Sequence, residues 1–115
     1  MHTLDLTPDQ LLTTTRSVRK RLDFDKPVPL HLIRQCLEIA LQAPSASNRQ
    51  TWHWIVVTDP DRRAAIGEFY RRAAADYLVS PRSAGRLFAD DPDRAPVQAR
   101  VGDSVVYLAE HMGEA

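Results

Sequence analysis

The segment Trp52–Thr58, with the sequence WHWIVVT, limits most strongly how this chain can fold. It is rich in aromatic and β-branched residues and lies between turn-forming residues, a pattern typical of a β-strand. No other segment has this character. A single buried strand would leave its N–H and C=O groups unpaired, at a cost of about 1–3 kcal/mol for each group. We therefore expect the strand to pair with strands elsewhere in this chain, in a second copy, or in sheet residues that this chain lacks.

Two helices are predicted before this strand. Thr7 is a typical N-cap, and a proline follows it, so a short helix should cover Pro8–Thr15. The charged segment Arg16–Asp25 is expected to be irregular, because the threonines before it disfavour helix. Pro29 and Pro44 should enclose a second helix, in which apolar residues recur at helical spacing.

Two further helices are predicted after the strand. Asp59 and the following proline should begin one of them. Ser80–Pro96, which lacks periodicity, should be an exposed and mobile segment that could act as a lid, and a last helix should stop near Gly113. The residues expected on the buried face of the third helix are Ile66, Phe69, Ala73, Ala74 and Tyr77.

Length and composition favour one small domain without a nucleic-acid partner. The chain has 115 residues, and its 15 Lys and Arg residues equal its 15 Asp and Glu residues, so no net charge attracts it to nucleic acid or an anionic membrane. The single cysteine, Cys36, is expected to be a small core residue in a reducing compartment. The four histidines lack the close spacing of a metal site, and no leader or membrane span is recognisable. We expect a cytoplasmic protein without a metal.

A basic cluster follows the first predicted helix. On irregular backbone, Arg16, Ser17 and Arg19 can offer guanidinium and hydroxyl donors to one phosphate group. Lys20 and Arg21 add further positive charge. Taken alone, the cluster favours a solvated basic turn, which is the commoner role of such a run.

A loop of small polar residues, Pro44–Trp52, connects the second helix to the predicted strand. Its sequence, PSASNRQTW, would let a flat ring approach the backbone. Ser45, Asn48 and Gln50 could reach the polar edge of that ring. Taken alone, the loop favours an ordinary helix-to-strand connection. No side chain in the sequence stands out as a dedicated catalytic acid or base.

The two motifs and the elements between them resemble the opening of the nitroreductase family. The family pattern is an Arg-Ser-x-Arg element followed by APSxxNxQPW and a strand. This sequence reads TRSVRKRL, then LHLIRQCLEIALQAPS, then SASNRQTWHWIVV and DPDRR, so the similarity is dense over Thr13–Arg63. It extends more loosely to DSVVYLAEHM. The paired motifs in this order are more specific than either one alone.

The resemblance implies an α+β fold, in which helices surround a mixed sheet and this chain supplies at least one strand. It implies that residues 1–115 form one domain, the N-terminal part of a longer family fold. Family members are homodimers that bind FMN between subunits. The residues implied at the flavin are Arg16, Ser17 and Arg19 from one subunit, and Pro44, Ser45, Ala46 and Asn48 from its partner.

The implied reaction is ping-pong transfer of hydride from NAD(P)H, through the flavin, to an electron-poor acceptor such as a nitroaromatic or a quinone. Two positions depart from the family pattern: Thr15 replaces an arginine, and Thr51 replaces the proline before the tryptophan. Two alternatives stay open. One is a related flavin enzyme that performs reductive dehalogenation or flavin destruction, and the other is a dimeric interaction module that has lost flavin binding.

Overall fold

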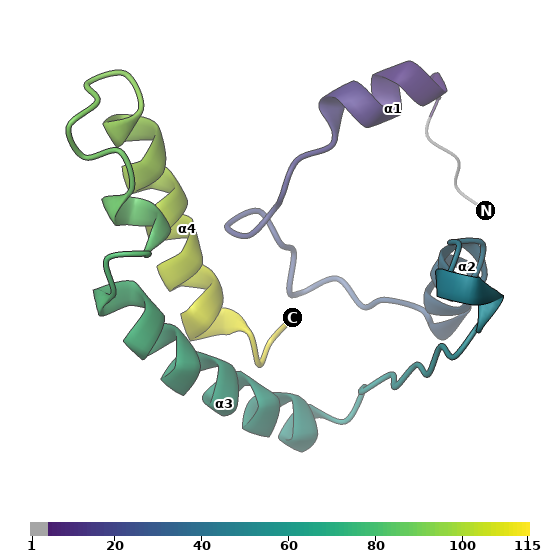
Figure 1. Ribbon diagram of the computed structural model, residues 1–115. Coiled ribbons are helices and arrows are strands. Elements are labelled where there is room, and N and C mark those ends of the chain that lie inside the picture. The colour runs from purple at the N-terminus through teal and green to yellow at the C-terminus, as the bar shows by residue number, and fades with distance from the viewer. Residues whose placement is uncertain (1–4) are drawn as a thin grey trace. The chain divides into compact units, whose positions relative to one another are not determined.

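The computed structural model describes residues 5–115, and these residues fold into helices joined by irregular segments (Figure 1). Residues 1–4, which we included in the predicted domain, lie outside the described residues. The α-helices are α1 (Pro8–Thr14), α2 (Leu30–Ala40), α3 (Pro60–Val79) and α4 (Ala95–His111), and the short 3-10 helices are η1 (Ala46–Asn48) and η2 (Ala84–Arg86).

The chain divides into two compact units. The first unit contains the chain up to Arg16 together with Asp25–Val56, and therefore holds α1, α2 and η1. The second unit contains Ser17–Phe24 together with Val57–Ala115, and therefore holds α3, η2 and α4. The basic cluster is thus divided between the units after Arg16.

The expected α+β fold with a mixed sheet is wrong, because residues 5–115 contain no β-strand. The segment Trp52–Thr58 is irregular, and the side chain of Ile55 is 89% exposed. The physical reason is the one that made the strand awkward in the sequence. A strand is defined by hydrogen bonds to a neighbour, and the described part of the chain offers this segment no neighbour.

Helix starts are where the sequence predicts them. Thr7 caps α1, because its hydroxyl accepts from the backbone N–H of Gln10 and the Gln10 side chain accepts from the backbone N–H of Thr7. Asp59 caps α3, and its carboxylate accepts from the backbone N–H of Arg62 at 2.9 Å. Both signals act within one helical turn, so they do not depend on the rest of the fold.

The α2 helix has the predicted apolar face, but this face is only partly covered. Ile33, Leu37 and Ala40 are half-buried, whereas Leu30 at the start of the helix is 56% exposed. Cys36 is exposed, so its expected position in a core is wrong. The helix repeats every 3.6 residues, and Cys36 lies next in sequence to Leu37, about 100° away from it around the helix.

Small residues form the packing centre of the second unit, where α3 and α4 lie against each other (Figure 1). Gly67 and Ala74 of α3 and Ala109 of α4 are buried, whereas the predicted core residue Phe69 is 69% exposed. Apolar periodicity selected Ala74 correctly, but it also favoured large side chains such as Phe69, whereas the helices meet through the smallest ones. A Cβ atom added to Gly67 would lie 2.6 Å from the backbone nitrogen of Gly113, so only glycine allows this approach.

Part of the predicted mobile segment Ser80–Pro96 is packed against α4. Ser83 is 3% exposed, and η2 follows it directly. The backbones of Gly85 in η2 and Gly102 in α4 approach closely, since a Cβ atom on Gly102 would lie 2.9 Å from the Cα atom of Gly85. The expectation of a wholly exposed segment is therefore wrong. None of the helices in residues 5–115 combines the length and apolar character needed to cross a membrane.

Candidate functional site

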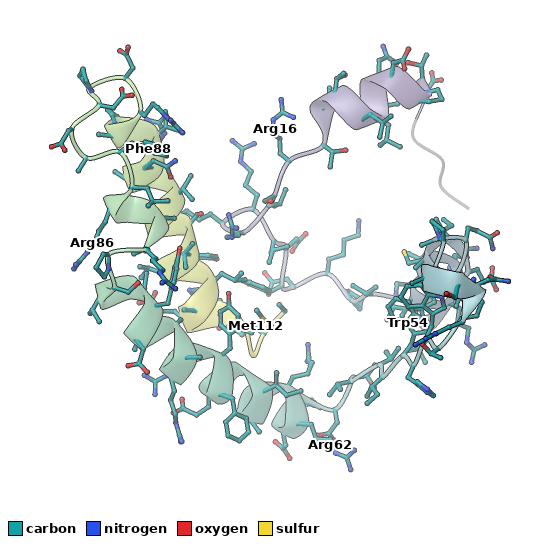
Figure 2. The ribbon with its side chains drawn as sticks, in the orientation of Figure 1. Arg16, Trp54, Arg62, Arg86, Phe88 and Met112 are labelled. Atoms are coloured by element: carbon teal, nitrogen blue, oxygen red, sulfur yellow. The ribbon has the colours of Figure 1, made fainter. Side chains whose placement is uncertain are left out.

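The first implied flavin residue, Arg16, comes directly after Thr15, the C-cap of α1 (Figure 2). This helix ends at three threonines whose hydroxyls all donate back to carbonyl groups of the preceding turn. One terminal nitrogen of Arg16 donates to the carbonyl oxygens of Thr13 and Thr15, at 3.0 and 2.7 Å. Arg16 therefore caps the C-terminal carbonyl groups of α1, where a positive charge is favourable.

The second implied arginine, Arg19, lies in the other unit and contacts α4. Arg19 is half-buried, and its Nη1 donates to the hydroxyl oxygen of Ser104 at 3.4 Å. The Ser104 hydroxyl in turn donates to the carbonyl oxygen of Val101 at 2.7 Å. Ser17 is exposed at the start of the same segment. The segment Ser17–Phe24 thus presents a guanidinium group that α4 holds from one side.

A second contact fixes the far end of this segment on α4. The ring of Phe24 stacks on His111, with ring centroids 5.8 Å apart and planes inclined by 23°. On α4 itself, Tyr107 lies against His111 with centroids 4.3 Å apart, and Nδ1 of His111 is 2.9 Å from a carboxylate oxygen of Glu114. Aromatic pairs of this geometry stabilise by about 0.5–1.5 kcal/mol. The segment is therefore attached to α4 near both of its ends.

The second group of implied residues, Pro44, Ser45, Ala46 and Asn48, lies together in the loop after α2, in the first unit. Ser47, Asn48 and Gln50 adopt left-handed backbone angles, with φ of 55°, 49° and 50°. Such angles cost non-glycine residues up to about 1–2 kcal/mol each, least for asparagine. Three of them within four positions give the loop a defined and strained shape.

Side-chain hydrogen bonds hold this shape. The backbone N–H of Gln50 donates to the Ser45 hydroxyl at 3.0 Å. The Gln50 amide then donates to the side-chain oxygen of Asn48 at 2.7 Å and accepts from the indole N–H of Trp52 at 3.1 Å. Gln50 is therefore the centre of the network, and the ring of Trp54 stacks on that of Trp52 at its outer end. Strained backbone of this kind clusters at ligand sites in other proteins.

The electrostatics of Arg16 and Arg19 differ from those of Arg71 and Arg72 on α3. In residues 5–115, the carboxylate of Glu68 on α3 pairs with both Arg71 and Arg72, and these partners lower its pKa, Arg72 most strongly. Neither Arg16 nor Arg19 pairs with a carboxylate in the same residues. The arginines of the basic cluster thus keep an uncompensated charge that an anion could use.

The structure keeps the residues of the small-residue loop together, but it divides the Arg-Ser-x-Arg motif between the two units. The loop that contains Pro44, Ser45, Ala46 and Asn48 belongs to the same unit as Arg16, whereas Ser17 and Arg19 belong to the α4 unit. Sequence reasoning missed Ser104 and the pair of Phe24 and His111, which hold the arginine-bearing segment. The one signal for Ser104 was its position as a polar residue within the apolar pattern of the last helix.

Comparison with known proteins gives one consistent family. The family model described as the nitroreductase family matches residues 12–113. The chain is 50% identical over 84 residues to an NADH dehydrogenase of Thermus thermophilus, a match covering 68% of this chain and 36% of that relative. It is 43% identical over 63 residues to a 4-nitrobenzoate reductase of Nocardioides sp., covering 55% of this chain and 25% of the relative.

A third relative is named as a deiodinase and not as a reductase or dehydrogenase. The chain is 36% identical over 59 residues to iodotyrosine deiodinase 1 of Rattus norvegicus, covering 51% of this chain and 20% of that protein. The chain therefore spans about a third or less of the length of these curated relatives. No solved structure was found that matches it. Because the family match includes both motifs and continues through α4, the chain belongs to the nitroreductase family.

Proposed function

We propose that this chain is part of an FMN-dependent NAD(P)H oxidoreductase that reduces nitroaromatics, quinones or similar electron-poor acceptors. Membership of the nitroreductase family supports an oxidoreductase, and the names of the Thermus and Nocardioides relatives describe the oxidation of NADH and the reduction of 4-nitrobenzoate. We also propose that residues 1–115 form the N-terminal part of one nitroreductase-like domain.

The observation that carries the proposal is the state of Arg19. Its guanidinium group is held by a neutral hydroxyl and not by a carboxylate, so its charge is not neutralised within residues 5–115. A phosphate group with two negative charges is the ligand that best matches such a planar set of donors. With the exposed hydroxyl of Ser17, this donor set fits the phosphate of FMN.

Arg16 would reinforce this grip through its remaining donors. It now uses one terminal nitrogen to cap α1. A guanidinium group has five N–H donors, so Arg16 can serve the helix end and a ligand at the same time. We propose that Arg16, Ser17 and Arg19 hold the phosphate and the ribityl chain.

Pro44, Ser45, Ala46 and Asn48 would approach the flavin ring of the partner subunit in a homodimer. Their small side chains leave the backbone accessible, and the network centred on Gln50 holds the strained loop in one shape. A loop that is ordered before binding loses less entropy when a ligand arrives. This order supports a role in binding, which the partner would complete.

The residues of this chain would bind and orient, and we assign none of them as a catalytic acid or base. When bound, FMN would supply the redox chemistry, since flavins accept hydride from NAD(P)H and reduce a second substrate. Arginine charge near the phosphate would fix the cofactor's position. The small residues near the ring would leave room for an acceptor.

The similarity to iodotyrosine deiodinase 1 supports a second candidate, which is reductive dehalogenation of an aromatic compound. Both candidates need the same cofactor, so they differ only in the acceptor. Halide release from an iodinated phenol, measured beside reduction of 4-nitrobenzoate with the same flavin-loaded protein, would distinguish them.

The test of the proposed function is the visible absorption spectrum of the purified protein, before and after addition of excess FMN and removal of unbound FMN by desalting. We expect retained flavin absorbance, and a fall in affinity of about 100-fold or more in the double variant Arg16→Ala, Arg19→Ala, because two charge-assisted contacts are lost. Arg62→Ala is the matched control, since Arg62 is an exposed arginine of α3 outside the proposed site (Figure 2). A folded protein that retains no FMN would overturn the proposal and favour a non-catalytic interaction module.

A further inference from the structure

We infer that Ser104 of α4 is a positioning residue for the proposed phosphate site. It holds Nη1 of Arg19 and so directs the rest of the guanidinium group toward a phosphate. This inference rests on the proposed function and adds a residue that neither motif contains. The contact that carries it is the hydrogen bond from Arg19 Nη1 to the Ser104 hydroxyl oxygen, at 3.4 Å in a partly buried position.

The donors and acceptors at Ser104 leave it one role toward Arg19. Its single hydroxyl hydrogen is donated to the carbonyl oxygen of Val101 at 2.7 Å, one turn earlier in α4. The lone pairs of the oxygen are then directed away from the helix backbone and can only accept. Because an arginine has donors and no acceptor, Arg19 and Ser104 match in this one direction.

A neutral partner matters for the strength of the grip. A carboxylate at this position would also orient Arg19, but it would neutralise the charge that the phosphate needs. A serine hydroxyl orients the group and leaves its charge available. With Nη1 occupied, Nε and Nη2 form the remaining edge of the guanidinium plane, and in residues 5–115 neither atom makes a hydrogen bond. Two adjacent N–H groups on one edge are the arrangement that binds phosphate in a bidentate manner.

The second attachment of the segment supports the same role for α4. Phe24 stacks on His111, seven residues after Ser104, so the segment bearing Arg19 is held to one helix at two points. An arginine fixed in this way loses little side-chain entropy on binding. The α4 helix thus serves as the platform on which the Arg-Ser-x-Arg element is presented.

The experiment compares the affinities of the full chain for FMN and for riboflavin, which lacks the phosphate, by quenching of flavin fluorescence. The ratio of the two dissociation constants isolates the contribution of the phosphate. In Ser104→Ala we expect the preference for FMN to fall by about fivefold, as for loss of one hydrogen bond that orients a charged group. Ser104→Thr keeps the hydroxyl and should restore the preference.

Ser80→Ala is the matched control. Ser80 also donates its hydroxyl hydrogen to a carbonyl three residues earlier, that of Tyr77, at 2.7 Å, but no arginine donates to it within the described residues. If Ser104→Ala loses the helical circular dichroism signal, Ser104→Cys replaces it, because cysteine has a similar size and accepts hydrogen bonds weakly.

The outcomes separate the two proposals. A wild-type preference for FMN that falls in Ser104→Ala and not in Ser80→Ala supports the positioning role. A wild-type preference that is unchanged in Ser104→Ala overturns this role and leaves the proposed phosphate site standing. A wild-type protein that binds FMN and riboflavin equally overturns the phosphate site and the role of Ser104 with it.

Discussion

The two segments that we propose for flavin binding are stabilised by different kinds of interaction. The loop Ser45–Gln50 is held by side-chain hydrogen bonds between residues at most five positions apart. The segment Ser17–Phe24 is held by α4, and the partners Arg19 and Ser104 are 85 positions apart. The first shape is encoded locally, whereas the second exists only when the α4 unit is folded.

This difference predicts which change in structure would disrupt each of the two segments. Loss of packing between α3, η2 and α4 should release Arg19 and leave the shape of the loop unchanged. Loss of the loop network should change the approach to the flavin ring and leave the unfolding of the α4 unit unchanged. Regions of one chain can open independently in this way when few interactions couple them.

The largest effect is expected from Gly102→Ala. The new Cβ atom would lie 2.9 Å from Cα and 3.2 Å from the nitrogen of Gly85, so the backbone of η2 would have to move. We expect a loss of about 2 kcal/mol in the free energy of unfolding, although alanine favours helix by about 1 kcal/mol. Urea unfolding followed by circular dichroism measures this loss, and FMN affinity should fall with it.

The same substitution on the other side of the contact, Gly85→Ala, is the control for this close approach. Its Cβ atom would meet Cα of Gly102 at 3.4 Å, which is an ordinary contact, and Gly85 does not need a positive φ. We expect a change below about 1 kcal/mol. Equal destabilisation by the two variants would contradict the geometry at this crossing.

This crossing also marks the limit of prediction from sequence. The starts of α1 and α3 were predicted correctly, since the caps at Thr7 and Asp59 act within one turn. The packed face of α3 was predicted correctly only at Ala74, because periodicity also favours Phe69, which is exposed, and does not select Gly67. The strand at Trp52–Thr58 failed for a related reason: its residues favour a strand, but a strand needs a partner that no local pattern can supply.

The second largest effect is expected at Ser47 in the strained loop. Its φ of 55° and ψ of 24° are left-handed, and a β-branched residue tolerates them least. Ser47→Val should destabilise the loop by about 1–2 kcal/mol, and Ser47→Gly should be neutral or slightly stabilising. Exchange of the Gln50 amide hydrogen, which is bonded to Ser45, measures this opening. The comparison of the two segments would fail if Ser47→Val lowered the stability of the α4 unit as much as Gly102→Ala does.

The sequence identified the motifs of the candidate site but not the residue that holds one of them on α4. The family resemblance implied that Arg16, Arg19 and the loop around Ser45 belong to the site, and the family match supports that resemblance. The resemblance did not imply Ser104, because no local pattern marks a helical serine as the partner of an arginine that is distant in sequence. Residues that bind can be recognised by their motif, while residues that position them depend on packing.

The smallest effect is expected from Glu68→Gln in α3. Glu68 pairs with Arg71 and Arg72 of the same helix, so this network is local, although α3 lies in the unit that has the distant contacts. Arg72 and Arg71 lower the pKa of Glu68 below its ordinary value of 4.5. A carboxyl group with a lowered pKa stabilises the fold above the unfolded pKa, and this contribution is lost as the pH falls through the lower folded value. Glu68→Gln should therefore lower the thermal midpoint slightly at pH 7, by at most about 2 °C for an exposed network, and the difference should disappear in more acidic solution.

FMN affinity at pH 7 should not change in this variant, since both partners of Glu68 lie on α3 itself. A fall in FMN affinity in Glu68→Gln would show that this local network is coupled to Arg19, and the two kinds of stabilisation would then not be separable within the α4 unit.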